Sequence, residues 1–145
     1  MVQLFARIAL ATGFILPVLD RTGGLGPAGS TNVAWGNWPN FVDYTHQLLP
    51  FLNSSFSVIA ARIATICEIV LALGLLLGYK TKWMGLGSAI LTALFGICMF
   101  VNLGPLSPFT YPVFLFTAAG LLLWKQSSFR WSIDQYLISK IQRQK

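Results

Sequence analysis

The stretch Ser57–Leu77 reads SVIAARIATICEIVLALGLLL and decides the fold. It contains only two charged side chains, Arg62 and Glu68. A helix of about 20 apolar residues crosses the roughly 30 Å hydrocarbon layer of a bilayer. We therefore interpret this stretch as a membrane-spanning helix that carries two buried charges.

Composition extends this interpretation to the whole chain. Of the 145 residues, 55% are hydrophobic and only 10% are charged, whereas soluble domains have about 25% charged residues. This length is typical of one domain, covering residues 1–145. Apolar segments at about 2–20, 57–78, 83–103 and 109–124 predict an all-α, integral membrane four-helix bundle.

The basic residues predict the orientation of this bundle. Lys80 and Lys82 lie between the second and third segments, and the residues after the fourth segment are also basic. Cytoplasmic loops of membrane proteins carry an excess of Lys and Arg. We expect a multi-pass protein of the inner (plasma) membrane with both termini inside, and the net charge of +6 then indicates anionic lipid and no nucleic acid.

Two amphipathic regions lie outside the four segments. The long first loop, about 21–56, is rich in glycine at first and then contains Trp35, Trp38 and an apolar stretch at 41–52. Tryptophan prefers the membrane–water interface, so we expect a short helix on the outer face. The tail at 129–143 places apolar residues on one helical face, which predicts a helix in the headgroup layer.

Four ionisable residues lie in or beside the first two spans: Arg7, Asp20, Arg62 and Glu68. Charges at this depth are costly and usually face protein partners. Aligning the midpoints of two antiparallel spans pairs Arg7 with Glu68 and Asp20 with Arg62. Such pairs could fix only the helix register, or Asp20, Arg62 and Glu68 could line a polar ligand pocket.

The outer loop offers further candidate ligand-binding residues. His46, with Tyr44 and Asp43, could donate a hydrogen bond to the carbonyl of a quinone-like ligand, and Trp35 and Trp38 could flank the ring. The alternative is that His46 caps a helix and the tryptophans are interfacial anchors. A single histidine predicts no metal site, and Cys67 and Cys98 are interpreted as packing residues.

The chain resembles the DoxX family of small four-helix membrane proteins. The resemblance covers spans one to three and rests on Arg7–Phe14 followed by Leu19-Asp20-Arg21, on Glu68–Gly78, and on Tyr79-Lys80-Thr81-Lys82 before a third helix rich in small residues. It implies a four-helix bundle and association with membrane redox chemistry, at most as a subunit of an oxidoreductase of the thiosulfate:quinone type. Arg7 and Glu68 match motif positions of that family.

Two functions follow as hypotheses. The first is a membrane subunit linked to a redox system that binds a quinone or lipid between its helices. The second is a non-catalytic scaffold or assembly subunit of a larger membrane complex, with a membrane protein or a second copy as partner. The sequence contains no flavin, haem or iron–sulfur motif, so the first hypothesis requires a quinone as non-covalent cofactor or a redox partner.

Overall fold

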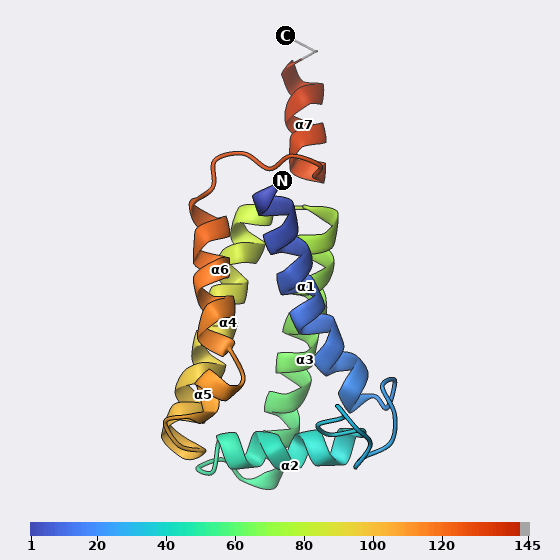
Figure 1. The fold of residues 1–145 in the computed structure, drawn as a ribbon, viewed down its shortest axis with the longest axis vertical. Helices are drawn as coiled ribbons and strands as arrows, with labels where there is room; N and C mark the ends of the chain where they lie inside the picture. The colour runs from blue at the N-terminus through green and yellow to red at the C-terminus, as the bar shows by residue number, and fades with distance from the viewer. Residues whose placement is uncertain (143–145) are drawn as a thin grey trace.

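The computed structural model describes residues 1–142 and is all-α over that range. Its seven helices are drawn in Figure 1: α1 (Val2–Arg21), α2 (Trp38–Leu48), α3 (Ser54–Leu77), α4 (Thr81–Asn102), α5 (Ser107–Thr110), α6 (Val113–Lys125) and α7 (Ile133–Gln142). α1, α3, α4 and α6 run along the long axis of the molecule. The start of α1 and all of α7 lie at one end, here called the terminal end, and α2 crosses the other, called the α2 end.

Three helices are long and apolar enough to span a membrane: α1, α3 and α4. Their outward faces carry large apolar side chains, and Ile66 and Leu94 are both more than half exposed. An exposed apolar surface this extensive is suited to lipid and unsuited to water. These observations confirm three of the predicted spans and indicate a multi-pass membrane protein.

The fourth span differs from the prediction. Helix α6 has 13 residues and is about 20 Å long at 1.5 Å per residue, which is short of the hydrocarbon thickness. The chain at Tyr111 and Pro112 separates it from the four-residue α5, because proline lacks the N–H that a continuous helix needs. The predicted segment at 109–124 is therefore an interrupted helix, whose short first part contains Pro108.

Capping residues set the ends of α3. The Asn53 side chain accepts a hydrogen bond from the Phe56 N–H, so the helix begins at Ser54, three residues before the predicted start. At the other end Gly78 adopts a left-handed conformation with φ of 65°, which favours glycine. A side chain at Gly78 would also collide with the Arg7 guanidinium.

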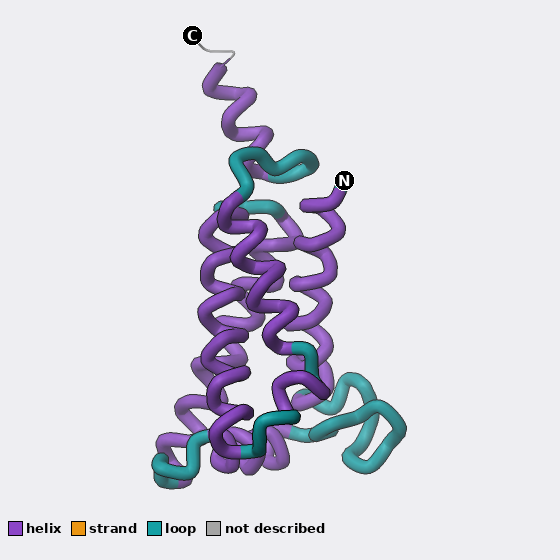
Figure 2. Tube along the Cα trace, turned by 60° about the vertical axis from the view of Figure 1, so that its left-hand side comes forward, coloured by secondary structure: helices purple, strands orange, loops and turns teal. Residues whose placement is uncertain are grey.

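The spans pack as two close pairs (Figures 1 and 2). The core between α1 and α3 includes Leu10, Ala11, Ala72 and Leu75. α4 and α6 approach so closely that a Cβ atom at Gly120 would lie 2.7 Å from the Gly85 carbonyl oxygen, as expected where small residues drive helix packing in lipid. The two pairs enclose space between them at the α2 end.

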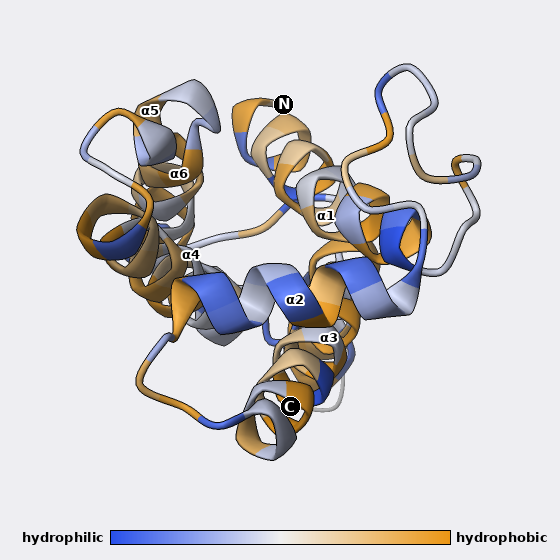
Figure 3. Cartoon of the chain, turned by 90° about the horizontal axis from the view of Figure 1, so that it is seen from below, coloured by the Kyte–Doolittle hydropathy of each residue, from blue (hydrophilic) through white to orange (hydrophobic). Residues whose placement is uncertain are grey.

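Helix α2 closes that end. Figure 3 shows it running across the bundle, with hydrophilic and hydrophobic residues alternating along it. Its buried residues are Phe41, Thr45 and Leu48, at the three- and four-residue spacing of one helical face, while Asp43 and His46 are exposed. This confirms the short amphipathic helix predicted for the first loop.

The tail helix differs from its prediction in both length and direction. α7 begins at Ile133 instead of 129, because Phe129 packs against the core and Asp134 is tied to the bundle. The Asp134 carboxylate accepts from the N–H groups of Lys80 and Thr81, at 2.7 and 2.8 Å. α7 then continues along the long axis away from the bundle (Figure 1), whereas a headgroup-layer helix would lie across it. Residue 143, the predicted end, lies outside the described residues.

Candidate ligand-binding cavity

A cavity of about 660 Å³ lies between the two helix pairs, with α2 across one side. Its walls come from α1, α3, α4 and the α5–α6 interruption, and they are mostly apolar or aromatic. The residues lining it include Phe14, Phe41, Leu91, Phe95, Met99, Val113 and Phe116. Ligand pockets typically enclose 300 to roughly 1,000 Å³ with a few polar groups in an apolar lining, and this cavity matches that description.

The polar centre of the wall is an ion pair between Arg21 and Glu68. Arg21 Nη2 donates to Glu68 Oε2 at 2.6 Å, and both residues are at least 95% buried. Arg21 Nη1 donates to Thr65 Oγ1 at 2.7 Å and Nε to the Pro17 carbonyl at 2.9 Å. Both charged residues line the cavity, so the pair is an accessible polar surface in an apolar chamber.

Aromatic rings of α2 and of the loop between α1 and α2 cover the guanidinium. The Arg21 Cζ atom lies 3.7 Å from the centroid of the Phe41 ring and 5.5 Å from that of Trp35. A desolvated guanidinium gains cation–π stabilisation from such rings. The buried face of α2 is thereby joined to the last turn of α1.

The neighbouring Asp20 fixes the loop that carries Trp35. Its carboxylate accepts hydrogen bonds from the N–H groups of Ala34 and Gly36, both at 2.8 Å, and from Trp35 at 3.3 Å. Three consecutive N–H groups directed at one carboxylate form a strong charge-assisted arrangement. Asp20 therefore holds the loop in place above Arg21.

Both predicted ion pairs are wrong. Glu68 pairs with Arg21 instead of Arg7, and Asp20 binds backbone N–H groups instead of Arg62. The midpoint alignment compared Cα levels, but side chains on a helix point back toward its N-terminus. Arg21 accordingly reaches one turn back to the Pro17 carbonyl and meets Glu68 there.

Arg7 lies too near the terminal end to reach Glu68. Its Nε and Nη2 donate to the carbonyls of Leu75 and Leu76, at 2.8 and 3.1 Å, and Nη1 donates to that of Trp131 at 3.1 Å. Leu75 is seven residues beyond Glu68, which is about 10 Å along the helix. Arg7 ties the end of α3 to the segment before α7.

The remaining candidate residues differ in whether they line the cavity. Tyr44 lines the cavity. Arg62 is exposed, because it lies two positions from the cavity-lining Ala60 and Ala64 and so on another face of α3. His46 is exposed and its Nδ1 is 3.1 Å from Ser57 Oγ, outside the cavity lining. Trp38 begins α2 and packs on Phe41, also outside that lining.

Burial raises the pKa of the Tyr44 phenol above its ordinary value, and the nearby Tyr111 adds to the shift. Since the ordinary tyrosine value is about 10, Tyr44 keeps its hydroxyl proton at neutral pH. Tyr44 therefore serves the α2 side of the cavity as a hydrogen-bond donor or acceptor.

Sequence reasoning missed Arg21 as a site residue. Arg21 follows Arg7 by 14 residues, close to four helical turns, so both lie on the buried face of α1. That periodicity was available as a signal. The interruption at Tyr111 and Pro112 was also missed as part of the lining, although irregular backbone at membrane depth is tolerated where it lines a cavity.

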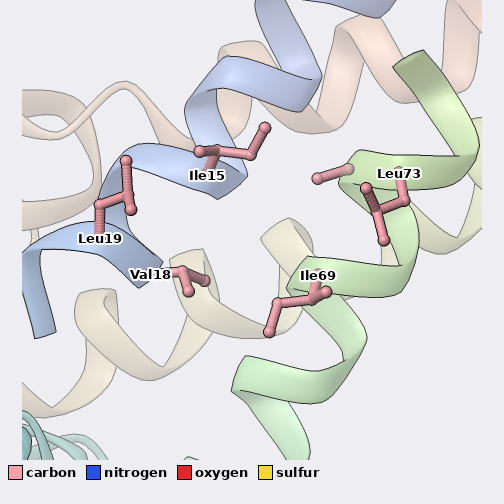
Figure 4. Close-up of a pocket in the computed structure, with 6 residues that line it drawn as sticks. Ile15, Val18, Leu19, Ile69 and Leu73 are labelled. Carbon is pink, nitrogen blue, oxygen red and sulfur yellow. The ribbon is translucent and has the colours of Figure 1, made fainter. Parts of the chain in front are cut away.

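A second, smaller hollow lies between α1 and α3 on the outside of the bundle. Figure 4 shows its lining of Ile15, Val18, Leu19, Ile69 and Leu73, all aliphatic, and its volume is about 170 Å³. No polar group borders it, so it offers nothing to orient a ligand. We interpret it as part of the lipid-facing surface.

Within residues 1–142 no group of three or more His, Cys, Asp or Glu side chains is placed to hold a metal ion. Comparisons with protein-family models, with curated proteins and with solved structures found no match to this chain. The cavity and its polar wall are therefore the features from which the function is inferred.

Proposed function

We propose that this protein is a membrane subunit that binds a quinone, or a lipid of similar chemistry, in the cavity beneath α2. The observation that carries the proposal is the buried Arg21–Glu68 pair in the wall of an apolar chamber of about 660 Å³. Ionisable groups within a membrane span usually mark a ligand or ion pathway. The link to a redox system comes from the resemblance to DoxX proteins.

The shape of the chamber supports a ligand in preference to a purely structural pair. A structural pair needs only two helices in contact, whereas here both charged residues border open volume. Phe14, Phe41 and Phe95 provide flat apolar surface for a ring. The interrupted α5–α6 segment borders the same chamber, as discontinuous helices do at membrane binding sites.

The chain's own contribution in this proposal is binding and orientation. Its residues supply the apolar chamber and the polar wall, while electrons travel through the bound quinone and a partner. The basic residues Lys80, Lys82 and Lys125 favour an orientation with both termini on the cytoplasmic side of the inner membrane. In that orientation the cavity lies in the outer half of the bilayer. A quinone would reach it from the membrane.

The test uses the full chain in lipid nanodiscs. A short-chain quinone should raise its thermal unfolding temperature, and organic extraction of the purified protein should recover quinone. Ala64→Phe, which fills the cavity from α3, should abolish the thermal shift. Ala9→Phe, on the exposed face of α1, should leave it unchanged. A parent protein whose unfolding temperature shifts with neither the quinone nor its reduced form would overturn the proposal.

One observation favours the alternative of a scaffold or assembly subunit. α7 has no buried residues, and Tyr136, Ile138 and Ile141 are more than half exposed. An exposed apolar face on a projecting helix is a surface that a partner could cover. Crosslinking in native membranes, with and without deletion of 133–145, distinguishes this function: loss of a crosslinked partner on deletion would support it.

A further inference from the structure

One of the two carboxylate oxygens of Glu68 accepts no hydrogen bond from the described residues. Oε2 accepts from Arg21, while Oε1 accepts from no group within residues 1–142. Only 3% of the surface of Glu68 is exposed, and Glu68 borders the cavity. The fully buried side-chain oxygens without a partner in residues 1–142 are Gln3 Oε1 and Thr81 Oγ1. Glu68 Oε1 is not one of them, so it keeps some surface beside the cavity and is suited to a ligand that donates a hydrogen bond.

The nitrogens of the neighbouring Arg21, in contrast, already donate to protein acceptors. All three nitrogens of Arg21 donate within the protein, to Pro17, Thr65 and Glu68. A guanidinium has five N–H groups, but Arg21 is only 1% exposed, so the remaining ones offer a ligand little surface. A ligand carbonyl therefore finds little donor surface at this wall.

The threonines that line the cavity, Thr45 and Thr92, show the same pattern, and Thr117 is bonded to Thr92 from outside the lining. Thr45 Oγ1 donates to the Phe41 carbonyl at 2.8 Å. Thr92 and Thr117 share a hydrogen bond of 2.9 Å, and each also lies in hydrogen-bonding distance of a carbonyl one turn back on its helix. Each hydroxyl has one proton to donate, so both protons of this pair are used. What remains for a ligand is acceptor capacity.

We propose that the cavity selects the hydroxyl-bearing, reduced form of a quinone, a quinol, through a hydrogen bond from a ligand hydroxyl to Glu68 Oε1. This inference rests on the proposed function and deepens it, because it names the ligand's redox state. A quinone has only carbonyl acceptors at its ring, which would face the acceptors of the wall. A quinol replaces that mismatch with a charge-assisted hydrogen bond.

The second hydroxyl of a bound quinol, on the opposite side of its ring, would meet different side chains. Tyr44 and Tyr111 line the cavity near α2, and a tyrosine hydroxyl can donate or accept. The second hydroxyl of a quinol can therefore be satisfied there. In this proposal the Glu68 side of the cavity discriminates between the two redox states. A substitution of Glu68 should therefore change the preference between them.

The experiment compares three ligands that share one ring: tetramethylhydroquinone, tetramethylquinone and the dimethyl ether of the hydroquinone. Binding to the protein in nanodiscs is measured anaerobically by calorimetry. We expect the hydroquinone to bind at least about tenfold more tightly than either other ligand, the ratio that corresponds to 1.4 kcal/mol. The ether keeps the ring and both oxygens but has a methyl group in place of each hydroxyl hydrogen, so it controls for the loss of the two donors.

Two variants locate the effect. Glu68→Gln should reduce the preference to within about twofold, because a neutral amide accepts more weakly and can also donate to a quinone carbonyl. Arg62→Gln, which changes a charge on the exposed face of the same helix, should retain the full preference. If Glu68→Gln unfolds, Arg21→Gln combined with Glu68→Gln gives a neutral pair, for which the same loss of preference is expected.

Equal affinity for the three ligands in the parent protein would overturn the redox selectivity and leave the proposed function intact. The same conclusion follows if the quinone binds more tightly than the hydroquinone. Failure of all three ligands, and of a short-chain quinone, to bind would overturn the proposed function itself.

Discussion

Arg7 and Arg21 lie on the same face of the same helix, and each is 99% buried, yet their environments differ. Arg7 donates only to backbone carbonyls, at the junction of α3 with the segment before α7. Arg21 donates to two side chains and one carbonyl, and it borders the cavity. Burial alone does not distinguish these two arginines, whereas their partners and the adjoining space do.

The carboxylates near the two ends are more alike than the arginines. Asp134 accepts two backbone N–H groups at the start of α4, and Asp20 accepts three from the outer loop. Both hold chain segments in place. The α2 end therefore differs from the terminal end chiefly in Glu68 and in the volume beside it.

The largest effect is expected from separating Arg21 and Glu68. Glu68→Leu leaves a buried guanidinium unpaired and should destabilise the protein by about 3–5 kcal/mol. The double variant Arg21→Met with Glu68→Leu should recover most of this loss, as a neutral apolar pair can replace a buried ion pair. Unfolding in mixed micelles measures both.

A matched double variant makes this result specific. Arg7→Met combined with Glu68→Leu should be no more stable than Glu68→Leu alone, because Arg7 does not contact Glu68. Recovery by Arg7→Met, without recovery by Arg21→Met, would contradict the assignment of the ion pair.

A smaller loss is expected from Arg7→Met alone. Three hydrogen bonds of 2.8–3.1 Å to carbonyls are lost, which should cost about 2–3 kcal/mol because carbonyls at a helix end can rebond to water. The segment 126–132 should become more sensitive to protease, while ligand affinity stays unchanged. A change in ligand affinity would contradict the structural role of Arg7.

The smallest effects are expected from substituting the two aspartates, Asp20 and Asp134. Asp20→Asn and Asp134→Asn should each cost about 1 kcal/mol, as the loss of a charged cap does. Only Asp20→Asn should also weaken ligand binding, because it loosens the loop that holds Trp35 over Arg21. Binding and melting measured on the same samples separate the two outcomes, and equal affinities in both variants would contradict the positioning role of Asp20.

Three of the four spans, and the helix across the α2 end, could be predicted from the sequence, since hydropathy and helical periodicity are local properties. The interruption before α6 was less visible, although Pro108 and Pro112 were present. The direction of α7 could not be predicted, because it depends on Asp134 binding the start of α4, a contact across more than 50 residues.

The candidate site divides in the same way. Glu68, Tyr44 and Trp35 were identified from the sequence and line the cavity. Asp20, Arg62, His46 and Trp38 were also identified and do not line it. Arg62 shows why: its charge within a span was an evident signal, but its position on the helix face turns it away from the cavity.

The sequence by itself determined that this chain belongs in lipid and that Glu68 must face protein, because apolar length and the cost of a buried charge act on each segment separately. Which arginine meets Glu68, and whether open volume lies beside the pair, was decided only by the tertiary structure. A side chain's reach and a cavity's volume depend on how helices distant in sequence are staggered and spaced.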